Sequence, residues 1–194
     1  MQELITNYFS EMEVESAFKL GKQKRLPVLI DFWAPNCKGC KKMDITTYQD
    51  TETLSYIDKH FIFVKYDITN RNAQKIDCSP ILWTPTFVVF SNDGSEVRKV
   101  SGYLSKPVFE SEMEIGRAMA FLRKAQSNVA LSILEVIISN HKDAVPEALY
   151  WAGVSSYFLN KRNAESLVPH WERLIANYPD SIWAEKADCL NIKL

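Results

Sequence analysis

The amino-acid sequence predicts an α/β sandwich built on a mixed sheet, followed by a shorter all-α region. One observation behind this is the alternation of apolar runs of strand length with amphipathic stretches of helical length. Another is the turn signal Asn92-Asp93-Gly94, which joins two strands into a hairpin. A third is an internal repeat after residue 124. The 194 residues suit a domain plus an appendage, and we expect domains at residues 1–124 and 125–194.

Apolar spacing distinguishes helices from strands in the first half of this domain. Residues 3–20 place apolar side chains at helical spacing, so we expect a helix there. Residues 25–33 form an apolar run near two prolines, which is typical of a buried strand. Residues 41–56 are helix-like with a break near Asp50, and residues 61–66 form a second buried strand.

The second half of the domain contains the hairpin. Residues 71–76 are expected to form a short helix, and residues 86–90 a third buried strand. The turn leads into residues 96–101, whose polar alternation suits an edge strand. Ser105, with a proline just inside, opens a helix that runs toward Lys124.

Composition and charge exclude several function classes. The chain is 46% hydrophobic and 24% charged, with a formal net charge of −1 and no long block of one sign. Such a balance gives no reason to expect nucleic acid or an anionic membrane as a partner. The first ten residues lack a basic stretch followed by an apolar core, and no apolar run approaches the roughly 20 residues that span a bilayer. We therefore expect a cytoplasmic location.

The cysteine spacing points to redox chemistry. Of four cysteines, Cys37 and Cys40 form a Cys-x-x-Cys pair where the strand ending at Trp33 meets the next helix. A disulfide across the first turn of a helix lets such a pair cycle between dithiol and disulfide with little backbone movement. Cys78 and Cys189 are too scattered to complete a zinc site, and the histidines share no ligand spacing. No metal and no bound cofactor is expected.

Several motifs together resemble the thioredoxin superfamily. They are the run Asp31-Phe32-Trp33-Ala34 before the Cys-x-x-Cys pair, and Thr84-Pro85-Thr86 at the start of the strand at 86–90. The resemblance covers roughly residues 1–124 and implies a thioredoxin-like α/β/α sandwich with thiol-disulfide oxidoreductase activity. Residues 41–50 and 61–67 resemble, within that superfamily, the thioredoxin-like domain of bacterial transmembrane thiol reductases.

The catalytic roles follow from this resemblance. Cys37 would occupy the N-cap of a helix, where free backbone N–H groups and nearby lysines such as Lys38 stabilise a thiolate, so it is the expected nucleophile. Cys40 would resolve the mixed disulfide formed with a substrate. Asp31 matches the family's buried acid, which would accept the Cys40 proton, although a strand-end acid with an ordinary hydrogen-bond partner is the alternative.

The resemblance also implies a substrate-binding loop. Pro85 matches the family's cis-proline, with a trans turn proline as the alternative, and the backbone of Thr84 would pair with a substrate peptide. Trp33, Asn36 and Lys38 complete the expected substrate-binding residues.

Two positions depart from thioredoxins proper. Asn36 stands where they carry Trp, and Lys38-Gly39 stands where they carry Gly-Pro. Glycine should raise backbone freedom and alter the reduction potential, which leaves an oxidant or isomerase role open. The expected electron donor is an external, thioredoxin reductase-like system, although the missing Trp changes the surface that such a reductase reads. Cys78 is either a third redox thiol or a small buried residue, and Cys189 is expected to pack in a core.

The C-terminal region carries the repeat. Residues 134–143 recur in degenerate form at 171–180, and Trp151-Ala152 is echoed by Trp183-Ala184. This resembles a tetratricopeptide unit of two helical hairpins. Because such arrays usually need more repeats, we expect the region to dock on the first domain or on a second copy. It is either a stabilising cap or a peptide-binding arm.

Two functions from different classes follow. The first is an enzyme that reduces or exchanges protein disulfides through Cys37 and Cys40 with an external electron source. The alternative is a redox-sensitive adaptor whose region 125–194 recruits a protein partner or a second copy.

Overall fold

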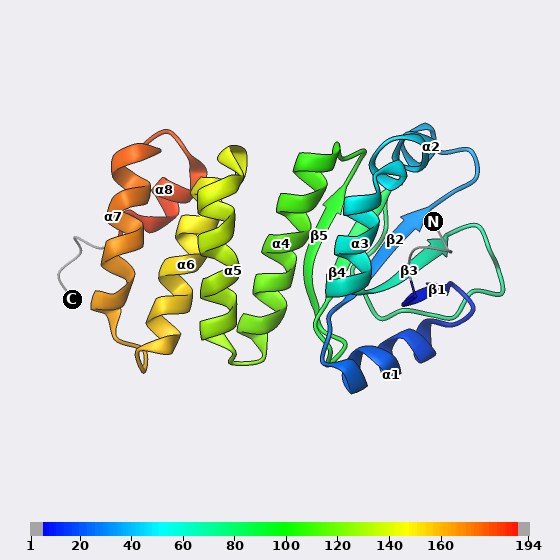
Figure 1. Cartoon of the computed structure of the whole chain (residues 1–194), viewed down its shortest axis with the longest axis horizontal. Helices are drawn as coiled ribbons and strands as arrows, with labels where there is room; N and C mark the ends of the chain where they lie inside the picture. The colour runs from blue at the N-terminus through cyan, green and yellow to red at the C-terminus, as the bar shows by residue number, and fades with distance from the viewer. Residues whose placement is uncertain (1–5, 190–194) are drawn as a thin grey trace. The chain divides into compact units, whose positions relative to one another are not determined.

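The computed structural model describes residues 6–189 (Figure 1). They form two compact units that divide between Ala120 and Phe121. The division lies four residues before the boundary expected from the sequence, inside helix α4 (Lys106–Arg123). The outer ends of both expected domains lie outside the described residues.

A mixed sheet forms the centre of the first unit, as the sequence predicts, and it has five strands where four were expected. Its strand order is β1-β3-β2-β4-β5. The first three strands of that order are parallel, and the last two are antiparallel to their neighbours. Strand β5 therefore lies at an edge, as expected. The strands are β1 (Tyr8–Ser10), β2 (Val28–Trp33), β3 (Ile62–Asp67), β4 (Thr86–Phe90) and β5 (Glu96–Ser101).

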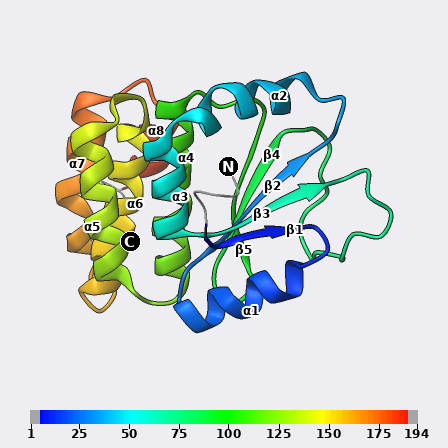
Figure 2. The ribbon, with the colours of Figure 1, turned by 45° about the vertical axis from the view of Figure 1, so that its right-hand side comes forward.

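Helices cover both faces of this sheet and complete an α/β/α sandwich (Figure 2). One face is covered by α1 (Val14–Lys24). The other is covered by α2 (Lys38–Ile45), the 3₁₀ turn η1 (Thr47–Gln49), α3 (Thr51–His60) and α4. Side chains alternate along a strand, so Ile30 packs on the α1 side whereas Leu29 packs on the α2 side. By the same alternation Asp31 faces α2, which places the acid on the side of the two cysteines.

The N-terminal segment corrects one expectation. A single helix over residues 3–20 is wrong, because residues 8–10 form strand β1 beside β3 and the helix begins only at Val14. Residues 3–5 lie outside the described residues. The helix continues to Lys24, beyond the expected end.

The short helix expected over residues 71–76 is also wrong. This segment is an irregular loop, and Gln74 ties it to the start of α1. The Gln74 N–H donates to the Glu11 carbonyl at 2.9 Å, and its side-chain carbonyl accepts from the Glu15 N–H at 2.9 Å. The Tyr66 hydroxyl donates to the Gln74 carbonyl at 3.0 Å. Tertiary hydrogen bonds therefore replace helical ones.

After the end of α4, the described residues of the second unit form four α-helices with 3₁₀ turns between some of them, which confirms an all-α region. Each helix packs on the next one in the chain. The rings of Trp171 and Tyr150 stack with centroids 5.1 Å apart, and the Trp171 indole N–H donates to the Tyr150 carbonyl at 3.0 Å. A Cβ on Gly153 would lie 2.5 Å from that indole nitrogen, so only glycine permits this packing. The helices are α5 (Ser127–Asn140), α6 (Val145–Leu159), α7 (Val168–Asn177) and α8 (Ile182–Ala187).

Cys189 does not pack in a core, so that expectation is wrong. Helix α8 ends at Ala187, which removes Cys189 from the apolar face of the helix and leaves its side chain exposed. None of the helices within residues 6–189 combines the length and the apolar character needed to cross a bilayer.

Candidate active site

Cys37 and Cys40 form a disulfide at the start of α2. Cys37 is the N-cap residue with an extended backbone, and its Sγ accepts a hydrogen bond from the Cys40 N–H at 3.0 Å. The N–H groups of a first helical turn carry partial positive charge, and no acidic residue occupies this turn. The position therefore stabilises negative charge on the Cys37 sulfur.

The two sulfurs differ in their access to solvent. Cys37 is half-buried, whereas Cys40 is 2% exposed. A substrate disulfide reaches the outer sulfur first, and the inner sulfur is available only for attack within the protein. This asymmetry matches the nucleophilic and resolving roles that the sequence assigns to Cys37 and Cys40.

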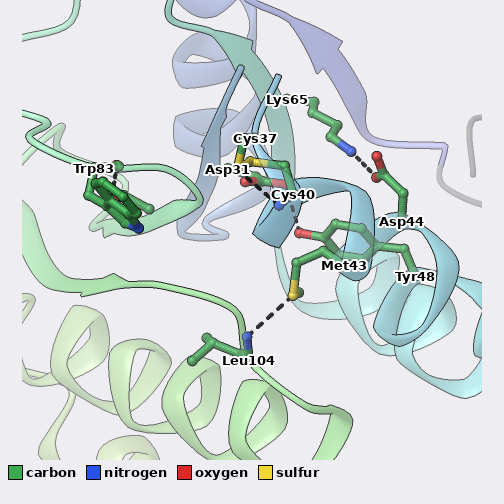
Figure 3. The surroundings of a disulfide bond; sticks show 10 residues. Asp31, Cys37, Cys40, Met43, Asp44, Tyr48, Lys65, Trp83 and Leu104 are labelled. Atoms are coloured by element: carbon green, nitrogen blue, oxygen red, sulfur yellow. Dashed lines mark hydrogen bonds and ion pairs between the residues drawn. A yellow bond between two sulfur atoms is a disulfide. The ribbon is translucent and has the colours of Figure 1, made fainter. Parts of the chain in front are cut away.

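Asp31 is a buried acid on the side of the sheet that the two cysteines occupy (Figure 3). It is 1% exposed, and its Oδ2 accepts a hydrogen bond from the Tyr48 hydroxyl at 3.0 Å. Its Oδ1 is buried and has no hydrogen-bond partner among residues 6–189. Burial raises the pKa of the carboxyl to about 6, although the positive charge of Lys65 and the Tyr48 hydrogen bond act in the opposite direction. Near neutral pH, Asp31 can both accept and return a proton.

The positive charge of Lys65 limits how far burial raises the pKa of the Asp31 carboxyl. Lys65 lies opposite Asp31 in the register of β2 and β3, and its ammonium forms an ion pair with Asp44. Its Nζ also lies 5.1 Å from the centroid of the Tyr48 ring. Part of its charge is thus neutralised by Asp44, which itself acts to raise the Asp31 pKa.

A groove of about 510 Å³ opens beside the disulfide. We call it the Pro85 groove, and it is lined by residues 36–39, residues 83–85 and Tyr103. The Thr84–Pro85 peptide bond is cis, and the Pro85 carbonyl accepts from the Gly102 N–H at 2.8 Å. A Cβ on Gly39 would lie 2.8 Å from Pro85 Cδ, so the missing side chain of Gly39 allows the loop to pack directly on α2.

The structure brings most of the expected site residues together. Asn36, Lys38, Thr84 and Pro85 line the Pro85 groove together with Cys37. Trp33, expected to bind substrate, is not among the residues that line the groove. It ends β2 on the same side of the sheet as Asp31, and its ring centroid lies 5.7 Å from Lys65 Nζ. Its position thus suits packing against Lys65.

Three residues of the site are not predicted from the sequence. Trp83 and Tyr103 line the groove, and Tyr48 holds Asp31. A large apolar residue directly before the Thr-Pro pair was a usable signal for Trp83. Tyr103 and Tyr48 reach the site only through the packing of distant segments, and no local motif marks them.

Cys78 lies apart from this arrangement. It is half-buried and packs on the α1 side of the sheet. Burial raises the pKa of its thiol, which lowers its reactivity at neutral pH. Of the two interpretations of Cys78, packing fits its surroundings better. Within the described part of the chain, His, Cys, Asp and Glu side chains form no group of three or more that could hold a metal ion.

Comparison with known proteins adds a family to this geometry. The family model described as a thioredoxin-like domain matches residues 14–116, which include both cysteines, Asp31 and the Thr84–Pro85 pair. The chain belongs to the thioredoxin-like domain family. This confirms the superfamily resemblance and the fold class that the sequence predicts.

Among curated proteins, this thioredoxin-like chain is similar to the thiol:disulfide interchange protein DsbD of Vibrio vulnificus. The two are 28% identical over 102 residues, which are 50% of this chain and 17% of that protein. Among solved structures, it is similar to a disulphide isomerase from Xylella fastidiosa, with 27% identity, 58% of this chain and 78% of that chain covered, and a TM-score of 0.39. The oxidised C-terminal domain of Neisseria meningitidis DsbD has 22% identity, 50% and 86% coverage, and a TM-score of 0.40.

Proposed function

We propose that this thioredoxin-like protein is a thiol-disulfide oxidoreductase that reduces or exchanges protein disulfides. The observation that carries the proposal is the pair of linked sulfurs with unequal access, the outer one at a helix N-cap and the inner one buried. Membership of the thioredoxin-like domain family and similarity to the thiol:disulfide interchange protein of Vibrio vulnificus support the same chemistry.

The first step is attack by Cys37 on a substrate disulfide. In the reduced protein, the Cys37 thiolate forms a new bond to one substrate sulfur, and the substrate S–S bond breaks. The other substrate sulfur leaves as a thiolate, which takes up a proton. The hydrogen bond from the Cys40 N–H and the adjacent helix N-terminus favour the thiolate that starts this step.

The second step releases the substrate. Cys40 gives its proton to the Asp31 carboxylate and attacks the Cys37 sulfur, which forms the Cys37–Cys40 disulfide and expels the second substrate thiolate. That thiolate is protonated in turn. Two electrons and two protons have then passed from the dithiol to the substrate, and Asp31 has only relayed a proton. Its unpaired buried Oδ1 is the atom we assign to this transfer.

A further dithiol must reduce Cys37–Cys40 again before the next cycle. We propose that an external reductase system similar to that of thioredoxins provides these electrons. A coupled assay with such a reductase and its nicotinamide cofactor tests this, because the disulfide should consume the cofactor in a stoichiometric burst. We also propose a cytoplasmic location, as expected from the sequence, and cell fractionation tests it.

The experiment that decides the proposal is a redox titration of the Cys37/Cys40 pair in glutathione or dithiothreitol buffers. A potential near about −270 mV indicates a reductase, and one between about −120 and −180 mV indicates an oxidant or isomerase. Cys37→Ser should abolish reduction of insulin disulfides, and Cys40→Ser should accumulate mixed disulfides. Cys78→Ser is the matched control and should behave as wild type. A pair that does not close reversibly would refute the proposal.

The adaptor hypothesis has an observation of its own in the helical unit. Phe158, Leu159 and Ile182 are large apolar side chains that are 45%, 48% and 61% exposed. If they recruit a protein partner or a second copy, Phe158→Ser with Ile182→Ser should abolish co-purification or self-association. Cys37→Ser with Cys40→Ser should leave that association intact.

A further inference from the structure

One side of the Pro85 groove presents apolar side chains to solvent. Trp83, which lines the groove, is 70% exposed, and Leu82 before it, which is not a lining residue, is 90% exposed. The Trp83 carbonyl accepts from the Thr86 hydroxyl at 2.8 Å, so the exposed indole extends from a tethered backbone. Figure 3 shows Trp83 on the loop before β4. A partner that covers this ring gains apolar burial at little cost in backbone ordering.

The other side of the groove is positively charged. Lys38 lines it, and Lys42 places its Nζ 4.1 Å above the ring centroid of Tyr103, which also lines it. The lining residues include no Asp or Glu. Asp44, the acidic residue nearest to Lys42 in the sequence, forms an ion pair with Lys65. The groove thus combines an apolar wall with a cationic one, and it complements a ligand that is apolar on one flank and acidic on the other.

Thr84 also lines the groove and offers a backbone position that can pair with a peptide. The Pro85 carbonyl is bonded to Gly102 and the Trp83 carbonyl to Thr86. By contrast, the Thr84 N–H and C=O form no hydrogen bond with any protein group within residues 6–189. In an extended peptide that pairs with Thr84, the residues before and after the cysteine project from the same face and lie about 7 Å apart along the strand. One of them can then contact Trp83 and the other Lys38.

From these observations we propose that the Pro85 groove selects its substrates. It prefers disulfides whose cysteine lies in an extended segment with a large apolar residue on one flank and an acidic residue on the other. Trp83 is the specificity residue for the apolar flank, and Lys38 is the specificity residue for the acidic flank. The inference rests on the proposed function and names the substrate class of the same site. The chemical step is the exchange described above, with the substrate reduced and Cys37–Cys40 oxidised.

The test uses the reduced full-length protein and homodimeric disulfides of short peptides. The residues that flank the peptide cysteine are Phe or Ser on one side and Glu or Lys on the other, in both orders. Initial rates are followed by acid quench and chromatography, and each is divided by the rate with hydroxyethyl disulfide, which has no flanking residues. We expect one order of the Phe/Glu peptide to react about tenfold or more faster than Ser/Lys. The Glu preference should weaken in high salt.

Variants assign the preference to each wall. Trp83→Ala should remove most of the Phe preference and retain the Glu preference, and Lys38→Glu should reverse the Glu preference. Both side chains are exposed, so these variants should fold. Val136→Ala is the control for loss of an exposed apolar side chain. Lys22→Glu, near the end of α1 that leads into the start of β2, is the control for the charge change, because Cys37 follows the opposite end of β2.

The possible failures are distinguishable. Equal rates for all peptides, with hydroxyethyl disulfide still reduced, would overturn the selectivity and leave the oxidoreductase. A peptide preference that survives both groove variants would overturn its assignment to Trp83 and Lys38. Failure to reduce any disulfide, including hydroxyethyl disulfide, would refute the proposed function together with the inference.

Discussion

Asp31→Asn should favour the folded state of the oxidised protein more at alkaline pH than at acidic pH. Asp31 is 1% exposed, and burial raises the pKa of its carboxyl from 3.8 to about 6. A shift of about two pKa units, at about 1.4 kcal/mol per unit, means that the ionised carboxylate costs the folded state about 3 kcal/mol. Asparagine keeps the shape and an oxygen that accepts from the Tyr48 hydroxyl, but it carries no charge.

The effect should depend on pH with a defined sign. A carboxyl with a raised folded pKa favours the folded state fully below the unfolded pKa of 3.8, and this contribution is lost as the pH rises through about 6. The stability of the variant relative to wild type should therefore increase by about 3 kcal/mol between about pH 4 and pH 8. The difference should shrink as the pH falls through about 6 toward about 4.

Urea unfolding of both oxidised proteins at a series of pH values measures this difference. Equal slopes against urea in the two proteins check that the same surface is exposed on unfolding. A difference that does not change with pH would refute the reasoning. The same substitution should slow the resolving step about 100-fold by removing the proton acceptor. Asp31 would then be a residue that stability disfavours and activity requires.

Three further substitutions test the packing of the site and of the helical unit. Gly39→Ala should destabilise the first unit by about 1–3 kcal/mol in urea unfolding, because its Cβ would lie 2.8 Å from Pro85 Cδ. Tyr48→Phe removes the hydroxyl that lowers the pKa of the buried carboxyl, so the pH midpoint of mixed-disulfide resolution should move upward in a stopped-flow profile. Gly153→Ala should lower the thermal stability of the helical unit by about 1–3 kcal/mol, because its Cβ would displace the Trp171 ring, and an unchanged near-ultraviolet circular dichroism spectrum would contradict this.

The reactive part of the site could be predicted from the sequence because its signals are local. The spacing of Cys37 and Cys40 after a buried strand places one sulfur at a helix start and the other one turn further in. The position of Asp31 in that strand sets its face by simple alternation. Its partner Tyr48 could not be predicted, since the contact depends on how η1 packs on the sheet.

The elements of the fold that the sequence predicts wrongly also depend on tertiary hydrogen bonds. Strand β1 spans three residues, too few for a periodic signal, and it exists because β3 offers hydrogen bonds to it. Residues 71–76 have helical spacing, but Gln74 makes its hydrogen bonds to the segment around Glu11. Tyr103 reaches the groove after β5 and a turn at Gly102, whose φ of 106° suits glycine.

The contact between Gly39 and Pro85 joins two properties that are often regarded as separable. The residues between the two cysteines are the usual place to adjust the reduction potential. In this chain one of them is also packed against the loop that holds Thr84 and Trp83. A substitution at Gly39 that changes electron affinity would therefore also move the wall that receives the peptide. A change in the reduction potential that leaves the substrate preference unaltered would therefore require compensating substitutions on both sides of the contact between Gly39 and Pro85.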